Sequence, residues 1–174
     1  MDTTTIKVLE ERIKNEMDEE AVRLLQDYYS KRKDYEALKN LYLTVLSHEP
    51  NHVLAMRQLA RLYANRYNDY KTAESYYQKI LSVLPGDALA HYNYGEMLEY
   101  QCKKYEKAKK QYELSIKAKP DFVQAYLNLA WLYVNRLNDP KEGIRVLRKG
   151  LEHVEDWKLY AHQAYILYAH LEDY

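Results

Sequence analysis

Apolar residues recur at steps of three and four along most of the chain, which is the spacing of one face of an α-helix. Between residues 53 and 63 the apolar positions are Val53, Met56, Leu59, Ala60, Leu62 and Tyr63. A polar segment at 65–69 interrupts this pattern, and a second apolar stripe then runs from Tyr70 to Leu81 before Pro85. The pattern predicts two antiparallel helices joined by a short polar turn.

This two-helix pattern returns at a fixed interval. Pro50, Pro85 and Pro120 stand 35 residues apart. A mostly aromatic column keeps the same interval at Tyr28, Tyr63, Leu98, Tyr133 and Tyr168. A fixed period of this size is typical of a stack of one supersecondary unit. We therefore place helix pairs near 17–47, 52–82, 87–117 and 122–152, with single helices at 5–15 and 157–171.

We expect the stack to form one domain over residues 1–174. Its units are a half-repeat at 5–15, four repeats at 16–50, 51–85, 86–120 and 121–155, and the terminal helix at 157–171. At the turns, Asp69 and Asp139 are expected to accept hydrogen bonds from the free amides of a helix start, with Pro140 in a first turn. Left-handed turn conformations are expected at Asn65, Asn68, Asn135 and Asn138.

Small, large and closing residues stand at fixed places within each unit. The third repeat holds His91, Tyr94, Gly95, Leu98, Ala108, Tyr112, Ser115 and Pro120, and the second holds Met56, Leu59, Ala60, Tyr63, Ala73, Tyr77, Ile80 and Pro85. These residues resemble the tetratricopeptide repeat over nearly the whole chain. The resemblance implies an all-α, right-handed α-solenoid of antiparallel helix pairs, whose first helices line a concave groove. The family period is 34, so we place the extra residue in the turn between the paired helices.

One polar column on the first helices keeps the 35-residue spacing: Arg23, Gln58, Asn93, Asn128 and Gln163. Each lies two residues before the column that should face the partner helix, so it is expected to point into the groove. A carboxamide is both donor and acceptor, and a ladder of them suits the backbone of an extended peptide. Further groove residues expected from the same geometry are Arg57, Arg61, Tyr92, Leu127 and Trp131. The other interpretation is a solvated polar stripe.

Composition narrows the function further. The chain has 26 Lys plus Arg and 26 Asp plus Glu, so its formal charge is zero, which argues against the excess of clustered positive charge that nucleic-acid binding requires. Cys102 is the single cysteine, and neither an apolar signal core nor an 18-residue apolar run is present. The six His residues form no HExxH motif, and no phosphate-cradling glycine loop is present. We expect a cytoplasmic, non-catalytic scaffold or adaptor without metal, cofactor or membrane segment, which binds a protein or peptide.

Several alternatives remain open. In the first alternative, the array is an architectural segment that contacts partners through its ends or through its convex face, where the basic residues of 101–150 are expected to gather. The terminal helix carries exposed aromatics, so we expect either self-association through it or continuation of the array. A 35-residue period also belongs to RNA-reading pentatricopeptide repeats. The columns that hold a chaperone-tail carboxylate in some tetratricopeptide proteins read here as Arg57, Arg61, Asn93, Gln124 and Asn128, which lack the last two charges.

Overall fold

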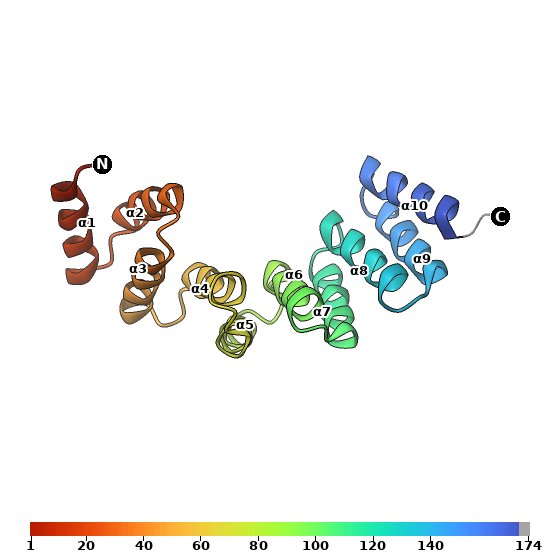
Figure 1. The fold of residues 1–174 in the computed structure, drawn as a ribbon, viewed down its shortest axis with the longest axis horizontal. Helices are drawn as coiled ribbons and strands as arrows, with labels where there is room; N and C mark the ends of the chain where they lie inside the picture. The colour runs from red at the N-terminus through yellow and green to blue at the C-terminus, as the bar shows by residue number, and fades with distance from the viewer. Residues whose placement is uncertain (171–174) are drawn as a thin grey trace. The chain divides into compact units, whose positions relative to one another are not determined.

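The structure, a computed structural model, describes residues 1–170, and within that range every regular element is a helix. The elements are α1 (Thr3–Asn15), α2 (Glu19–Arg32), α3 (Tyr35–His48), α4 (Val53–Asn65), α5 (Tyr70–Val83), α6 (Ala88–Glu96), η1 (Met97–Gln101), α7 (Tyr105–Ala118), α8 (Val123–Asn135), α9 (Pro140–Leu151) and α10 (Trp157–His170) (Figure 1). The predicted all-α chain of paired helices is confirmed, with helix ends within about two residues of the expected ones. Residue 171, the predicted end of the last helix, lies outside the described range.

The chain divides into two compact units, which we call unit 1 (Met1–Val83) and unit 2 (from Leu84). Unit 1 holds α1 to α5 and unit 2 holds α6 to α10. Within each unit every helix packs on the next one along the chain, which is the contact pattern of a stack. The expectation of one domain over residues 1–174 stays a prediction.

Each unit buries its own apolar side chains between the helices. In unit 1 the buried cluster includes Ile13 from α1, Leu25 from α2 and Val45 from α3. In unit 2 the largest buried side chains include Tyr112, Tyr126, Leu132 and Leu147. Burial of this kind contributes about 1.5–3 kcal/mol for each large apolar side chain, so the stack is stabilised helix by helix.

Aspartate side chains fix most helix starts. Asp69 Oδ1 accepts a hydrogen bond from the Thr72 amide at 3.0 Å, and Asp139 Oδ1 accepts one from the Glu142 amide at 3.0 Å, as predicted. The same cap is present at Asp2, Asp18, Asp34 and Asp87. Pro140 occupies the first turn of α9. Each such cap is worth about 0.5–2 kcal/mol, so the polar breaks in the sequence set the register of the helices.

The turn inside each helix pair contains one residue with a left-handed backbone. These residues stand 35 apart, at Lys33, Asn68, Lys103 and Asn138, with φ between 53° and 57°. The predictions for Asn68 and Asn138 are confirmed. Those for Asn65 and Asn135 are wrong, because both residues are the last helical residues of their first helices.

The extra residue of the 35-residue period lies in this same turn. The amide of Asp69 donates to the Tyr63 carbonyl at 2.9 Å, and the amide of Asp139 donates to the Tyr133 carbonyl at 2.9 Å, each spanning six residues. In the first pair the Asp34 amide reaches back only five residues, to Tyr29 at 2.9 Å. The later turns therefore hold one residue more than the first, which confirms the predicted location.

Gly95 lies where α6 packs against α7. A Cβ atom added there would lie 2.7 Å from Cε1 of Tyr112, a fully buried ring. Helices can therefore pair at this distance only with a hydrogen atom at position 95. Gly95 therefore faces the partner helix, and the side chain that it accommodates is Tyr112 of α7.

Candidate functional site

The starts of the first helices give the register of the site. The N-cap residues of these helices are Asp18, His52, Asp87 and Phe122, at steps of 34, 35 and 35 residues. Asp156 then begins α10 after a step of 34, since its Oδ1 accepts from the Lys158 amide at 2.8 Å. The first and last steps are therefore one residue shorter than the period that the prolines indicate.

This register changes the membership of the predicted polar column. Gln58, Asn93 and Asn128 occupy equivalent positions on α4, α6 and α8, and all three are half-buried. Arg23 is equivalent to Arg57 and not to Gln58, because α2 starts one residue later than a 35-residue step places it.

The last helix shows the same displacement. Leu159 and Ile166 of α10 are buried like Ala125 and Leu132 of α8, which lie 34 residues earlier. Gln163 therefore stands at the core position of α8 that Leu129 fills, and it falls outside the carboxamide column.

In unit 1 the predicted residues lie on the two first helices. Arg23 on α2 is exposed, Arg57 and Gln58 on α4 are half-buried, and Arg61 follows one turn later and is exposed. Gln58 and Arg61 both line a hollow of about 290 Å³ beside the end of α2 and the start of α3. Burial raises the pKa of Tyr42 to about 12, and the charge of Arg61 opposes this rise.

In unit 2 a hydrogen-bond network joins two predicted residues across neighbouring first helices. Asn128 Nδ2 on α8 donates to Tyr92 Oη on α6 at 3.1 Å and to Glu96 Oε1 at 3.4 Å. Tyr92 Oη in turn donates to Glu96 Oε1 at 2.9 Å. Burial and the Glu96 carboxylate raise the pKa of Tyr92, which keeps the hydroxyl a donor. The network engages the amide nitrogen of Asn128, so its carbonyl oxygen is the atom suited to a ligand.

Two aromatic rings extend this face toward α10. Trp131 of α8 and Tyr165 of α10 lie with ring centroids 6.4 Å apart, and both side chains remain exposed. They occupy equivalent positions in the register, 34 residues apart, where Arg61 and Glu96 stand on the earlier helices. Leu127, one turn before Trp131, is half-buried. The structure therefore brings Trp131 together with a residue that the sequence analysis did not include.

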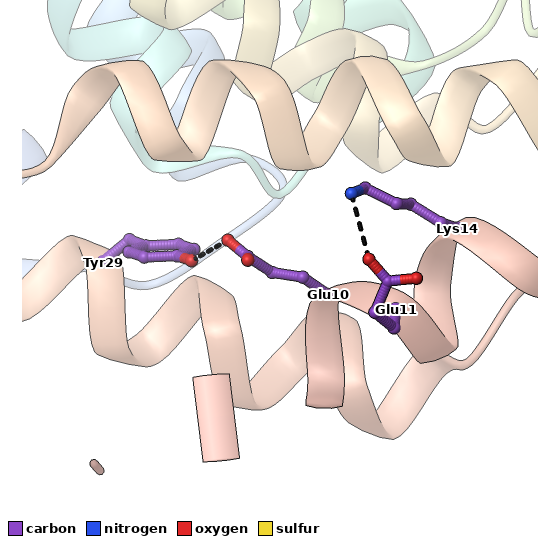
Figure 2. Close-up of polar contacts among 4 residues, drawn as sticks. All are labelled: Glu10, Glu11, Lys14 and Tyr29. Carbon is purple, nitrogen blue, oxygen red and sulfur yellow. Dashed lines mark hydrogen bonds and ion pairs between the residues drawn. The ribbon is translucent and has the colours of Figure 1, made fainter. Parts of the chain in front are cut away.

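The second helices form two equivalent hollows that the sequence analysis did not predict. One of about 540 Å³ lies among α7, α8 and α9, and one of about 420 Å³ lies among α1, α2 and α3. In the latter, Tyr29 Oη donates to Glu10 Oε1 at 2.7 Å, and Figure 2 shows the phenol pointing at that carboxylate. Figure 2 also shows Lys14 paired with Glu11 on α1, at 3.3 Å.

A buried carboxylate lies behind the face of unit 2. Glu99 in η1 is 1% exposed, and its Oε2 accepts from Tyr112 Oη at 2.9 Å. Burial raises the pKa of this carboxyl above its ordinary value of 4.5. The only polar signal in the sequence is one Glu in a column that holds Ala64 and Val134 in the neighbouring repeats.

The remaining chemistry is sparse within residues 1–170. No group of three or more His, Cys, Asp or Glu side chains in that range is placed to hold a metal ion. None of the helices in the same range has both the length and the hydropathy to cross a lipid bilayer.

Paired helices that stack in series, with side chains exposed along the first helices, define a helical-repeat protein of the solenoid class. Residues 88–122, which hold α6, η1 and α7, match the family model described as tetratricopeptide repeat. This match confirms, for residues 88–122, the tetratricopeptide-repeat resemblance that the repeat columns predict. No curated protein matches this chain.

Solved structures share this fold over most of the chain. PilF of Pseudomonas aeruginosa is 23% identical with a TM-score of 0.71, and the match covers 88% of this chain and 69% of that one. A crystal structure of MamA is 17% identical with a TM-score of 0.67 and 83% coverage of both chains. The first TPR of Spaghetti (RPAP3), bound to HSP90 peptide SRMEEVD, is 20% identical with a TM-score of 0.56, covering 77% of this chain and 94% of that one.

Proposed function

We propose that this chain is a non-catalytic interaction module that binds an extended segment of a partner protein along its first helices, as a scaffold or adaptor. One observation carries the proposal: within α6 to α10, every exposed large hydrophobic side chain lies on a first helix or in η1. These residues are Leu89, Tyr100, Trp131, Trp157, Tyr160, Tyr165 and Tyr168. Exposed apolar side chains that gather on one set of helices mark a candidate binding surface.

The chemistry of this face suits a peptide. Trp131 and Tyr165 offer two adjacent rings, and aromatic side chains are common energetic anchors of interfaces. Asn128 is held in place by Tyr92 and Glu96, so its carboxamide oxygen is preorganised to accept from a peptide amide. The RPAP3 structure, which contains a bound peptide, supports this mode for the fold. A chaperone tail is not the proposed ligand, since Gln124 and Asn128 stand where two cations would complete the carboxylate site.

The second candidate is an architectural role with self-association through α10. It is favoured by the exposure of that helix, where Trp157 is 73% exposed, Tyr168 78%, and Tyr160 and Tyr165 about half. A second copy that covers these rings would remove apolar surface from water, which is the main driving force of association.

Crosslinking mass spectrometry on the affinity-purified chain tests the proposal. We expect crosslinks from one linear segment of a partner to α8 and α10, and we expect Trp131→Ala with Tyr165→Ala to abolish them. The matched control is Leu43→Ala, which truncates a side chain of similar exposure on the second helix α3. If the double variant gives the same crosslinks to the partner segment as the parent chain, the proposal is contradicted.

Sedimentation velocity separates the two candidates. Self-association predicts a concentration-dependent dimer that Trp157→Ala with Tyr168→Ala dissolves. A monomer at all concentrations, together with segment-specific crosslinks, excludes the architectural role as the main one.

A further inference from the structure

A small polar hollow in unit 1 has a composition unlike that of the two hollows on the second helices. It has a volume of about 290 Å³ and lies where the end of α2 and the start of α3 meet the C-terminal half of α4. Its polar lining comes from Ser30, Tyr35, Gln58, Arg61, Asn65 and Arg66. Leu62 adds an apolar wall.

The lining carries positive charge and no carboxylate. Arg61 and Arg66 contribute two guanidinium groups, while the other two hollows include acidic residues such as Glu113 and Glu10. Guanidinium groups hold carboxylate or phosphate oxygens through paired, charge-assisted hydrogen bonds. Hydroxyl and carboxamide groups beside them add neutral donors to the same space.

One of the two guanidinium groups stacks on an aromatic ring. The Arg66 guanidinium carbon lies 4.3 Å from the centroid of the Tyr35 ring, a stacking contact that leaves the N–H edges available. The charge of Arg61 acts on the buried hydroxyl of Tyr42. The stacking contact restrains the Arg66 guanidinium, which lowers the entropic cost of binding an anion there.

The carboxylates at the adjacent helix starts are already engaged. Asp34 Oδ1 accepts from the Ala37 amide at 3.0 Å, and Asp69 accepts from the amide of Thr72 at 3.0 Å and from its hydroxyl at 2.6 Å. Helix caps of this kind hold a carboxylate at its own helix. Neither carboxylate belongs to the lining of the hollow.

We propose that this hollow binds an oxyanion carried by a partner, either a side-chain carboxylate or a phosphoryl group. The inference extends the proposed function, because it names an anionic anchor for a segment on unit 1, but the site is testable without any partner. The volume exceeds that of a lone anion, since a water molecule takes about 30 Å³ in the liquid. The apolar wall of Leu62 and Tyr35 suits the carbon stem of an anionic side chain.

The test is a titration of the 15N-labelled full chain followed by NMR, with the Nε–H signals of Arg61 and Arg66 as reporters. The probes are inorganic phosphate, acetate and N-acetyl-phosphoserine amide, each added at constant ionic strength. We expect saturable shifts of both signals. Arg61→Gln or Arg66→Gln should weaken binding at least about tenfold, as loss of a charged hydrogen-bond partner does. Lys7→Gln is the control, because that exposed residue of α1 lies outside the hollow and outside the predicted groove and should leave affinity unchanged.

The two sources of oxyanion separate in the same experiment. Saturation by phosphate and phosphoserine alone assigns the site to a phosphoryl group, and saturation by acetate as well admits acidic side chains. Linear shifts that persist in both variants, or no shift with any probe, overturn the proposal. Circular dichroism of each variant confirms that the helices are intact. Retained phosphate binding in Trp131→Ala with Tyr165→Ala would keep this site valid even if the partner-binding face of unit 2 failed its own test.

Discussion

The first helices of the two units carry different chemistry at equivalent positions. Arg61 of unit 1 corresponds to Glu96 and Trp131 of unit 2, so one column changes from a cation to an anion and then to an aromatic ring. One residue earlier, the column that faces the paired helix stays small, with Ala60 in unit 1 and Gly95 in unit 2. Stacking therefore constrains one face of each helix and leaves the other free to vary.

This difference distinguishes the positions that helix packing keeps small from the positions that are available to bind a ligand. Unit 1 presents two guanidinium groups around a hollow, and unit 2 presents adjacent rings beside a hydrogen-bonded carboxamide. Substitutions that exchange features between the units test how independent the two faces are.

The largest expected effect comes from giving unit 2 the small residue of unit 1, by Gly95→Ala. The new Cβ would lie 2.7 Å from Cε1 of Tyr112, whereas Ala60 already fits against its own pair. The buried ring must move, so we expect the free energy of unfolding to fall by about 1–3 kcal/mol. Urea unfolding followed by circular dichroism measures it.

The control for that change is Gly86→Ala. A Cβ at Gly86 meets no atom within 4 Å, and the residue does not have a positive φ. We expect stability to stay within about 1 kcal/mol of the parent, with any change a gain from the less flexible unfolded chain. Equal losses of stability in the two variants would show that the close contact between position 95 and Tyr112 does not cause the effect.

The next effect concerns Glu99, which occupies a column that is apolar in the neighbouring repeats. Its Oε1 is buried without a hydrogen-bond partner among the described residues, while Oε2 accepts from Tyr112. We expect Glu99→Gln to raise stability at neutral pH by on the order of 1 kcal/mol, because it removes a buried charge and keeps an acceptor for the phenol.

The pH dependence of stability gives the sign of this effect. Burial raises the pKa of Glu99, so the folded protein holds its proton to higher pH than the unfolded chain does. Stability therefore falls as pH rises from the ordinary carboxyl pKa through the folded one. Glu99→Gln should remove that fall when unfolding is measured across this range. A variant with the same slope as the parent would assign the pH dependence to other groups.

A smaller effect distinguishes two carboxamides of one column. Asn128 bonds to Tyr92 and Glu96, so Asn128→Ala should lower the free energy of unfolding by about 1 kcal/mol. Asn93 takes no part in that network, and Asn93→Ala should change stability by less than about 0.5 kcal/mol. Both variants should weaken binding of a partner segment. Thermal unfolding and crosslinking yield measured on the same samples test the two statements together, and equal stability losses would contradict the first.

The sequence predicts the stack well because its signals are local. Apolar steps of three and four, the recurring prolines and the aspartate caps each mark a helix within a few residues. The register of the last helix was harder to predict. The aromatic column favours a step of 35 residues, and that step wrongly placed Gln163 in the carboxamide column. The signal for a step of 34 is present in Asp156 as a helix cap and in Ala164 as the small residue.

The site was only partly predictable because its contacts join different helices. Gln58, Asn93 and Asn128 share a register position that periodicity alone reveals. The bond from Asn128 to Tyr92 and the pairing of Trp131 with Tyr165 depend on how far apart neighbouring first helices lie, which a one-dimensional pattern does not contain. The hollow at Arg61 and Arg66 likewise needs the ends of three helices to meet.

The smallest expected effect compares the two hollows on the second helices. Tyr29 of unit 1 donates a hydrogen bond to Glu10, while its equivalent in unit 2, Tyr133, has the Lys109 ammonium 6.0 Å from its ring centroid. Tyr29→Phe removes the hydrogen bond, so it should lower stability by about 0.5–1 kcal/mol. Tyr133→Phe keeps the ring and its attraction for the Lys109 ammonium, so it should lower stability by less than Tyr29→Phe does. Chemical unfolding of the two variants measures the difference, and a larger loss at Tyr133 would mean that equivalent hollows are stabilised in a way their side-chain contacts do not explain.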